Sequence, residues 1–172
     1  YIIASHVIEH TPDLVGFFEN ISSVLVDKGY LFLIIPDKRY CFDHFKPLSS
    51  IVEIVYAHLN SHDKPTFYSI LQHLNLQAHN DPIRHWNNDH GEPIQQNSLI
   101  DYSRQPIHIS EEIKQWEDKY TDVHMWQFVP DSFRSICNYL YENDFIDLKL
   151  IRVYPTHKNH HQFYVIMQKV AR

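Results

Sequence analysis

A short segment near the start of the chain contains the residue types that acid–base and metal chemistry require. The run His6-Val7-Ile8-Glu9-His10 has the spacing H-x-x-E-H, which in one class of zinc hydrolases puts two imidazoles on one face of a helix with the glutamate as general base. Either imidazole alone can orient a substrate or accept a proton, because it titrates near neutral pH. Pro12 disfavours helical conformation at the residue before it. We therefore keep a zinc hydrolase built on His6, Glu9 and His10 as an alternative, beside a structural loop in which these side chains only cap and hydrogen-bond.

A second polar group follows an apolar stretch that ends at Pro36. Its members are Lys38, Arg39, Tyr40, Asp43 and His44. We expect substrate recognition here, with Tyr40 or His44 as the base and with Arg39, beside Lys38, binding an anionic group. The structural alternative is a solvated turn with a salt bridge between Asp37 and Arg39.

His124 and Trp126 form a third candidate pair. They are two residues apart, and on an extended segment they would face the same way. We expect them to form a wall of the substrate pocket, and packing in the core is the alternative.

The chain contains 14 histidines, and two more local groups stand out. These groups are His79, His85 and His90, with Asp81 and Asp89 nearby, and His157, His160 and His161. Neither group has a recognised metal-ligand spacing. We therefore predict surface histidines and no metal site.

Hydrophobic patterning predicts the elements that position these side chains. Residues 1–5 are apolar and typical of a strand, and Thr11-Pro12-Asp13 opens a helix with an apolar stripe that Gly29 ends in a left-handed conformation. Residues 30–35 are apolar without alternation, which indicates a strand covered on both faces. Strand, helix and strand in this order form a βαβ unit.

The rest of the chain is predicted to be helical first and then a hairpin. We expect helices at 49–59, 66–76, from 110 and at 130–141, a loop at 78–106, and strands at 146–154 and 161–170 joined by a turn at 155–160.

Composition excludes several classes of protein. A length of 172 residues with 44% hydrophobic content predicts one domain. Only 3 glycines are present where about 12 are usual, and they are far apart, so the chain has no glycine-rich phosphate loop. A net charge of −6 with scattered basic residues argues against nucleic-acid partners. No apolar run reaches the roughly 20 residues that span a membrane, and two cysteines are typical of a reduced, cytoplasmic protein.

The segment from Ala4 to Asp13, the helix after it and the segment from Lys28 to Asp37 resemble the class I S-adenosylmethionine-dependent methyltransferases from their fourth strand onward. The runs Pro36-Asp37-Lys38-Arg39-Tyr40 and Asp122-Val123-His124-Met125-Trp126 are similar to a bacterial subgroup of that family. The resemblance implies an α/β fold: a partial Rossmann-like sheet of parallel strands with a C-terminal antiparallel hairpin, and a helical insertion at about 41–127.

The resemblance also implies a function, namely methyl transfer from S-adenosylmethionine to an unidentified small-molecule acceptor. Ser5 and His6 would then contact the cofactor. The family's glycine-rich turn would lie before Tyr1, so we expect this chain alone not to bind the cofactor. The first strand would have an uncovered edge, and we expect a homodimer or complementation by an N-terminal half. The alternative from another class is a non-catalytic binding or assembly module.

Overall fold

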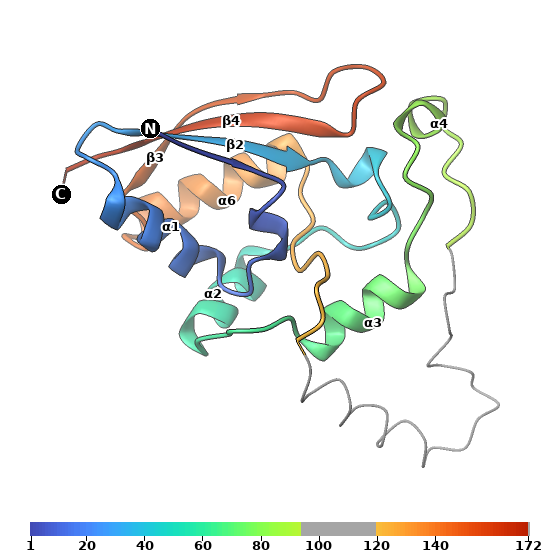
Figure 1. The fold of residues 1–172 in the computed structure, drawn as a ribbon, viewed down its shortest axis with the longest axis horizontal. Coiled ribbons are helices and arrows are strands. Elements are labelled where there is room, and N and C mark those ends of the chain that lie inside the picture. The colour runs from blue at the N-terminus through green and yellow to red at the C-terminus, as the bar shows by residue number, and fades with distance from the viewer. Residues whose placement is uncertain (94–119, 172) are drawn as a thin grey trace, which may run out of the picture.

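A four-stranded mixed sheet forms the centre of the computed structural model, which describes residues 1–93 and 120–171 (Figure 1). The described residues form β1 (Ile2–Ser5), 3-10 helix η1 (Ile8–His10), α1 (Leu14–Val24), β2 (Tyr30–Pro36), 3-10 helix η2 (Lys38–Tyr40), α2 (Ile51–Leu59), α3 (Phe67–Asn75), α4 (Pro82–Trp86), α6 (Pro130–Glu142), β3 (Leu148–Tyr154) and β4 (Gln162–Lys169).

The strand order is β1-β2-β4-β3. β1 and β2 are parallel, in a register that runs from Ile2 opposite Leu31 to Ser5 opposite Ile34. β4 is antiparallel to both β2 and β3, and it lies between them. The predicted strand–helix–strand unit and the C-terminal antiparallel hairpin are confirmed, and the protein belongs to the mixed α/β class.

Helices cover one face of this sheet in the described part of the chain. Figure 1 shows α1, α2 and α6 on the same side of the strands. Alternate residues of β2 and β4, such as Leu33 and Val165, face these helices and are fully buried. Residues between them face the other side, where Tyr30 remains 40% exposed. The prediction that β2 is covered on both faces therefore holds on one face only within the described residues.

Helix α1 begins and ends differently from the prediction. Asp13 is its N-cap and accepts a hydrogen bond from the Gly16 N–H at 2.9 Å, whereas the Thr11 hydroxyl donates to the carbonyl of Ile8. Lys28, with φ 63°, takes the left-handed conformation that was expected of Gly29. Gly29 is instead required by a close approach, because a Cβ there would lie 2.7 Å from the carbonyl oxygen of Val26.

The segment predicted as a loop at 78–106 contains a short helix, α4. Asp81 accepts hydrogen bonds from the backbone N–H groups of Ile83 and Arg84, and Pro82 stands in the first turn. Five residues are too few to show a hydrophobic period, so only this cap could have revealed the helix. The helix predicted from residue 110 lies outside the described residues. Within the described residues, no helix has the length and apolar character needed to cross a bilayer.

Candidate functional site

Three segments meet at the carboxyl ends of β1 and β2. They are residues 6–10 after β1, residues 37–46 after β2, and residues 122–128 before α6. Figure 1 draws the last segment in light orange, next to the blue turn after β1. The backbone N–H of Met125 donates to the carbonyl of Glu9 at 2.7 Å, and the N–H of Lys38 donates to the carbonyl of Phe128 at 3.0 Å. Parallel strands bring polar side chains together at this end of a sheet, which is where open α/β sheets bind ligands.

His124 is held by a buried ion pair. Its Nδ1–H donates to Oδ2 of Asp43 at 2.5 Å, and Lys46 Nζ lies 2.7 Å from the other carboxylate oxygen. All three residues are buried. Burial by itself would raise the pKa of Asp43, but the hydrogen bond from His124 and the charge of Lys46 outweigh it and hold the pKa below its usual value. The paired carboxylate fixes the tautomer of His124 and leaves Nε2 with a free lone pair.

His10 is oriented in the same way from the opposite side. Its Nδ1–H donates to Oδ1 of Asp122 at 2.8 Å, so its free lone pair is also on Nε2. Its ring meets that of His124 edge-on, with the centroids 4.6 Å apart. His10 is about one-third exposed, whereas His124 is buried. Solutes therefore reach this pair of imidazoles from the His10 side.

Glu9 completes the group. Its side chain is fully buried, and neither carboxylate oxygen has a hydrogen-bond partner among the described residues. His6 Nδ1 lies 3.4 Å from Oε1, an ion-pair contact that raises the pKa of His6. Buried carboxylates are normally paired or bound to a metal, because an isolated buried charge is very costly.

Glu9, His10 and His124 each bring one ligand atom within 4.8 Å of the others. Two imidazoles and one carboxylate form a common donor set for a divalent metal with open positions. Ligating histidines usually donate their other N–H to a carboxylate or a carbonyl, and Asp43 and Asp122 occupy those positions here. The arrangement is able to hold a metal ion that activates a bound hydroxyl group or water.

His6 contacts Glu9, but it is not one of the three residues whose ligand atoms converge. Residues 8–10 form a 3-10 helix instead of an α-helix, so His6 and His10 do not share one α-helical face. His6 has a φ of 53°, and its Nε2 lies 3.0 Å from Oε1 of Gln162 on β4. Ser5, the other expected cofactor contact, is an exposed residue at the end of β1. His124 occupies the place in the group that the sequence pattern gave to His6.

The residues after β2 are largely engaged with one another. Lys38 Nζ donates to the carbonyl of His44 at 2.7 Å, and burial lowers the pKa of Lys38. Arg39 binds Asp37 through two hydrogen bonds of 2.9 and 2.6 Å. This is the salt bridge that was the structural alternative. The ring of Tyr40 stacks on Trp86 of α4, with the centroids 4.0 Å apart.

His44 and Trp126 also lie apart from the three-residue group. His44 stacks on His90, with a centroid distance of 3.7 Å. Trp126 is buried, and its indole N–H donates to the carbonyl of Thr11 at 2.7 Å. Trp126 lines an apolar cavity of about 290 Å³ beside α2 and α3, and His124 does not line it. The expected shared wall of His124 and Trp126 is therefore absent from this cavity.

Sequence reasoning gave no role to Lys46 and did not connect Asp122 with His10. Lys46 follows Asp43 by three residues, a spacing that brings opposite charges together in one helical turn. Asp122 precedes His124 by two residues, but its partner His10 is 112 residues away and no local pattern connects them.

Comparisons of this chain with protein families, with curated proteins and with solved structures found no match.

Proposed function

We propose that Glu9, His10 and His124 bind a divalent metal ion that activates the hydroxyl group of a small-molecule acceptor, and that the reaction is a methyl transfer. One observation carries the metal centre. The fully buried carboxylate of Glu9 has no hydrogen-bond partner among the described residues. One of its oxygens lies within 4.8 Å of a ring nitrogen of His10 and of one of His124. Apart from the ion-pair contact with His6 at 3.4 Å, Glu9 has no partner among the described residues, and a cation at this point would give it one.

The chain's own residues prepare the donor atoms. Asp43 and Asp122 each accept a hydrogen bond from an Nδ1–H, so both rings present Nε2. Lys46 neutralises the buried Asp43 and keeps it ionised. A bound divalent metal lowers the pKa of a coordinated hydroxyl group, which makes it a nucleophile near neutral pH. The exposed side of His10 is the side from which an acceptor can approach.

Methyl transfer is proposed from the resemblance to the class I methyltransferases. Two features of the fold support it: the parallel pair β1 and β2, and the reversed strand β4 beside β2. The residues present do not form a site for S-adenosylmethionine. Ser5 is exposed, His6 is engaged with Gln162 and Glu9, and the sequence has no glycine-rich loop. We therefore assign acceptor activation to this chain and derive no step through the methyl donor.

The donor set itself favours a second candidate function. Two histidines and one glutamate bind the metal of several zinc hydrolases, and the same centre would then activate water. In that case the chain hydrolyses its substrate without a methyl donor. A non-catalytic binding module, the third alternative, predicts that no metal binds to this group.

Metal binding by matched variants tests the proposal. We expect the wild-type chain to bind Mn²⁺, which suits a donor set that includes a carboxylate, in equilibrium dialysis. Glu9→Gln keeps the shape of the side chain and removes its charge, and we expect it to weaken binding at this centre at least about 100-fold. Glu19→Gln, an exposed change on α1, is the matched control and should leave binding unchanged. Equal affinity of Glu9→Gln and wild type would refute the centre.

Once metal binding is established, product analysis separates the two reaction classes. Consumption of an ester or amide substrate by the metal-loaded chain without S-adenosylmethionine would favour the hydrolase. Because we expect this chain alone not to bind the donor, the second arm adds an N-terminal segment that supplies the donor site. A methylated acceptor that forms only with that segment and S-adenosylmethionine present would favour methyl transfer.

A further inference from the structure

A second cluster of imidazoles lies between the turn after β2 and helix α4. His44 comes from that turn, His85 from α4 and His90 from the loop after α4, and a ligand atom of each lies within 4.8 Å of the others. His79 stacks on the far side of His85, with the centroids 4.2 Å apart. None of these residues belongs to the centre formed by Glu9, His10 and His124.

Hydrogen bonds fix which nitrogen of His85 is free. Its Nε2 lies 2.9 Å from the carbonyl oxygen of His79. A carbonyl oxygen only accepts, so Nε2 carries the proton and Nδ1 carries a lone pair. That Nδ1 accepts a hydrogen bond of 3.0 Å from the Nδ1–H of His90, and a bound metal ion would replace this proton. Two nitrogens that bind one tetrahedral zinc at 2.0–2.1 Å are about 3.3 Å apart, so the observed spacing is close to that of two ligands of one ion.

His44 is held by the same kind of bond. Its Nδ1 donates to the carbonyl oxygen of Arg39 at 2.9 Å, which leaves the lone pair on Nε2. Two of the three imidazoles are thus oriented by a backbone carbonyl, an arrangement that is usual for metal-binding histidines. We propose that His44, His85 and His90 bind a divalent transition-metal ion through three imidazole nitrogens, with a fourth position open.

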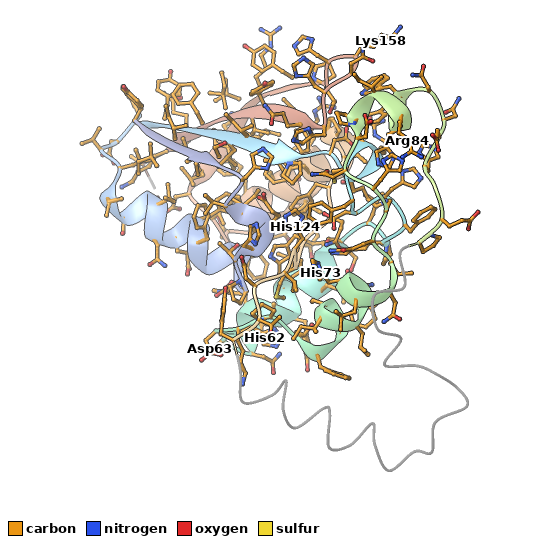
Figure 2. All side chains as sticks on the ribbon, turned by 45° about the vertical axis from the view of Figure 1, so that its right-hand side comes forward. His62, Asp63, His73, Arg84, His124 and Lys158 are labelled. Atoms are coloured by element: carbon orange, nitrogen blue, oxygen red, sulfur yellow. The ribbon has the colours of Figure 1, made fainter. Side chains whose placement is uncertain are left out.

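The surrounding contacts hold the backbone of this site. The ring of His44 stacks on that of His90, with the centroids 3.7 Å apart, and it must turn for its lone pair to reach the same ion. Trp86 stacks on Tyr40 and donates from its indole N–H to the carbonyl of His160 at 2.8 Å, which places α4 beside the loop between β3 and β4 (Figure 1). Arg84, labelled on α4 in Figure 2, binds Asp89 through hydrogen bonds of 2.7 and 3.2 Å. These contacts fix α4 and the loop that carries His90.

The chemistry of the donors selects the ion. Burial lowers the pKa of His44 and of His85, which favours the neutral form of imidazole that binds a metal. The acids next to these histidines in the sequence are engaged elsewhere: Asp89 pairs with Arg84, and Asp43 pairs with Lys46 and His124. Three neutral imidazoles without a carboxylate suit Zn²⁺, Cu²⁺, Ni²⁺ or Co²⁺ and do not suit Mg²⁺ or Ca²⁺, which prefer oxygen ligands.

The test is a titration of the ¹⁵N-histidine-labelled chain with ZnCl₂, followed by long-range ¹H–¹⁵N NMR of the imidazole rings. We expect the ligating nitrogens of His44, His85 and His90 to shift together and to saturate at one equivalent for this site. The signals of His10 and His124 report on the other centre in the same experiment, so failure of one proposal is distinguishable from failure of the other. Zinc-induced shifts confined to histidines outside these three would overturn this site.

Two variants provide an independent check by competition with a chromophoric zinc chelator. His90→Asn removes a ligand, and we expect zinc binding at this site to weaken about 100-fold or more. His79→Gln is the matched control. His79 stacks in the same cluster, but both its ring nitrogens are occupied by the backbone of Asp89 and Asp81. The His79→Gln variant should bind zinc with an affinity within about two-fold of the wild type. An equal loss of zinc affinity in both variants would refute the assignment. If His90→Asn does not fold, the NMR titration of the wild-type chain decides the question.

Discussion

His124 donates a hydrogen bond of 2.5 Å to Asp43, and the two residues are 81 positions apart in the chain. Both side chains are buried, and the pair joins the turn after β2 to the segment that leads into α6. Figure 2 shows His124 in the interior of the molecule, near His73. The same contact is therefore a structural link between two segments and the device that orients a candidate metal ligand.

Replacing Asp43 by Asn should destabilise the protein strongly. The change leaves Lys46 buried without a counter-charge, and breaking a buried ion pair on one side costs about 3–5 kcal/mol. Urea denaturation monitored by circular dichroism measures the free energy of unfolding. Asp131→Asn breaks the exposed pair with Arg134 and should cost less than about 1 kcal/mol. We expect the double variant Asp43→Asn/Lys46→Met to recover part of the stability that Asp43→Asn loses. If Asp43→Asn alone lost no more stability than Asp131→Asn, the prediction would be wrong.

Stability should decrease on acidification because of His73. Burial lowers the pKa of His73 to about 4 from an ordinary value of 6.5, and Gln77 donates a hydrogen bond of 2.8 Å to its Nε2. Between these two pH values the unfolded chain binds more protons than the native one, so the free energy of unfolding falls as the pH drops from 6.5 towards 4. After solvent screening, the contribution of this half-buried group is about 1 kcal/mol.

Urea denaturation at pH 5 and pH 8 measures this effect. The free energy of unfolding should differ less between pH 8 and pH 5 in His73→Gln than in the wild type. The exposed variant His157→Gln serves as the control and should keep the wild-type difference. An unchanged difference in His73→Gln would show that other groups cause the pH dependence.

S-adenosylmethionine should not bind to this chain. The expected contacts Ser5 and His6 are exposed or engaged elsewhere, and the three glycines lie far apart in the sequence. Isothermal titration calorimetry with the methyl donor should give only heats of dilution, both with and without Mn²⁺. Saturable binding at micromolar concentrations would require a cofactor site that neither the sequence pattern nor the described residues indicate.

Strand β1 should promote self-association. It pairs only with β2 in the described residues, and Ile3 on this strand is 61% exposed. An apolar edge strand with unpaired backbone groups tends to pair with another chain. Sedimentation velocity should show a mass that rises with concentration, and Ile3→Lys should reduce it. Val24→Lys changes an apolar residue on α1 that is even more exposed, at 72%, and should have less effect. A concentration-independent monomer would contradict this prediction.

Sequence patterns predicted the regular elements well and the site only in part. The apolar stripe of α1 and the apolar runs of β2, β3 and β4 are local signals, and these four elements are present within a few residues of the predicted bounds. Glu9 and His10 were also recognisable, because they are neighbours in one motif. Their partner His124 is distant in the sequence, and only the packing of the segment around Met125 against Glu9 brings it there. His44 joins His85 and His90 for the same reason, since their proximity depends on how α4 packs on η2.

The hydrogen bond between His10 and Asp122 has a consequence for the order in which the molecule assembles. It spans 112 residues, so the group formed by Glu9, His10 and His124 exists only after the two ends of a very long loop have met. In the denatured chain, permanent closure of a loop of about 100 residues removes conformational entropy equivalent to about 4–5 kcal/mol. A ligand that holds both segments would act as a reversible cross-link on that loop. Its binding would then raise the free energy of unfolding, and the gain would increase with the concentration of the ligand.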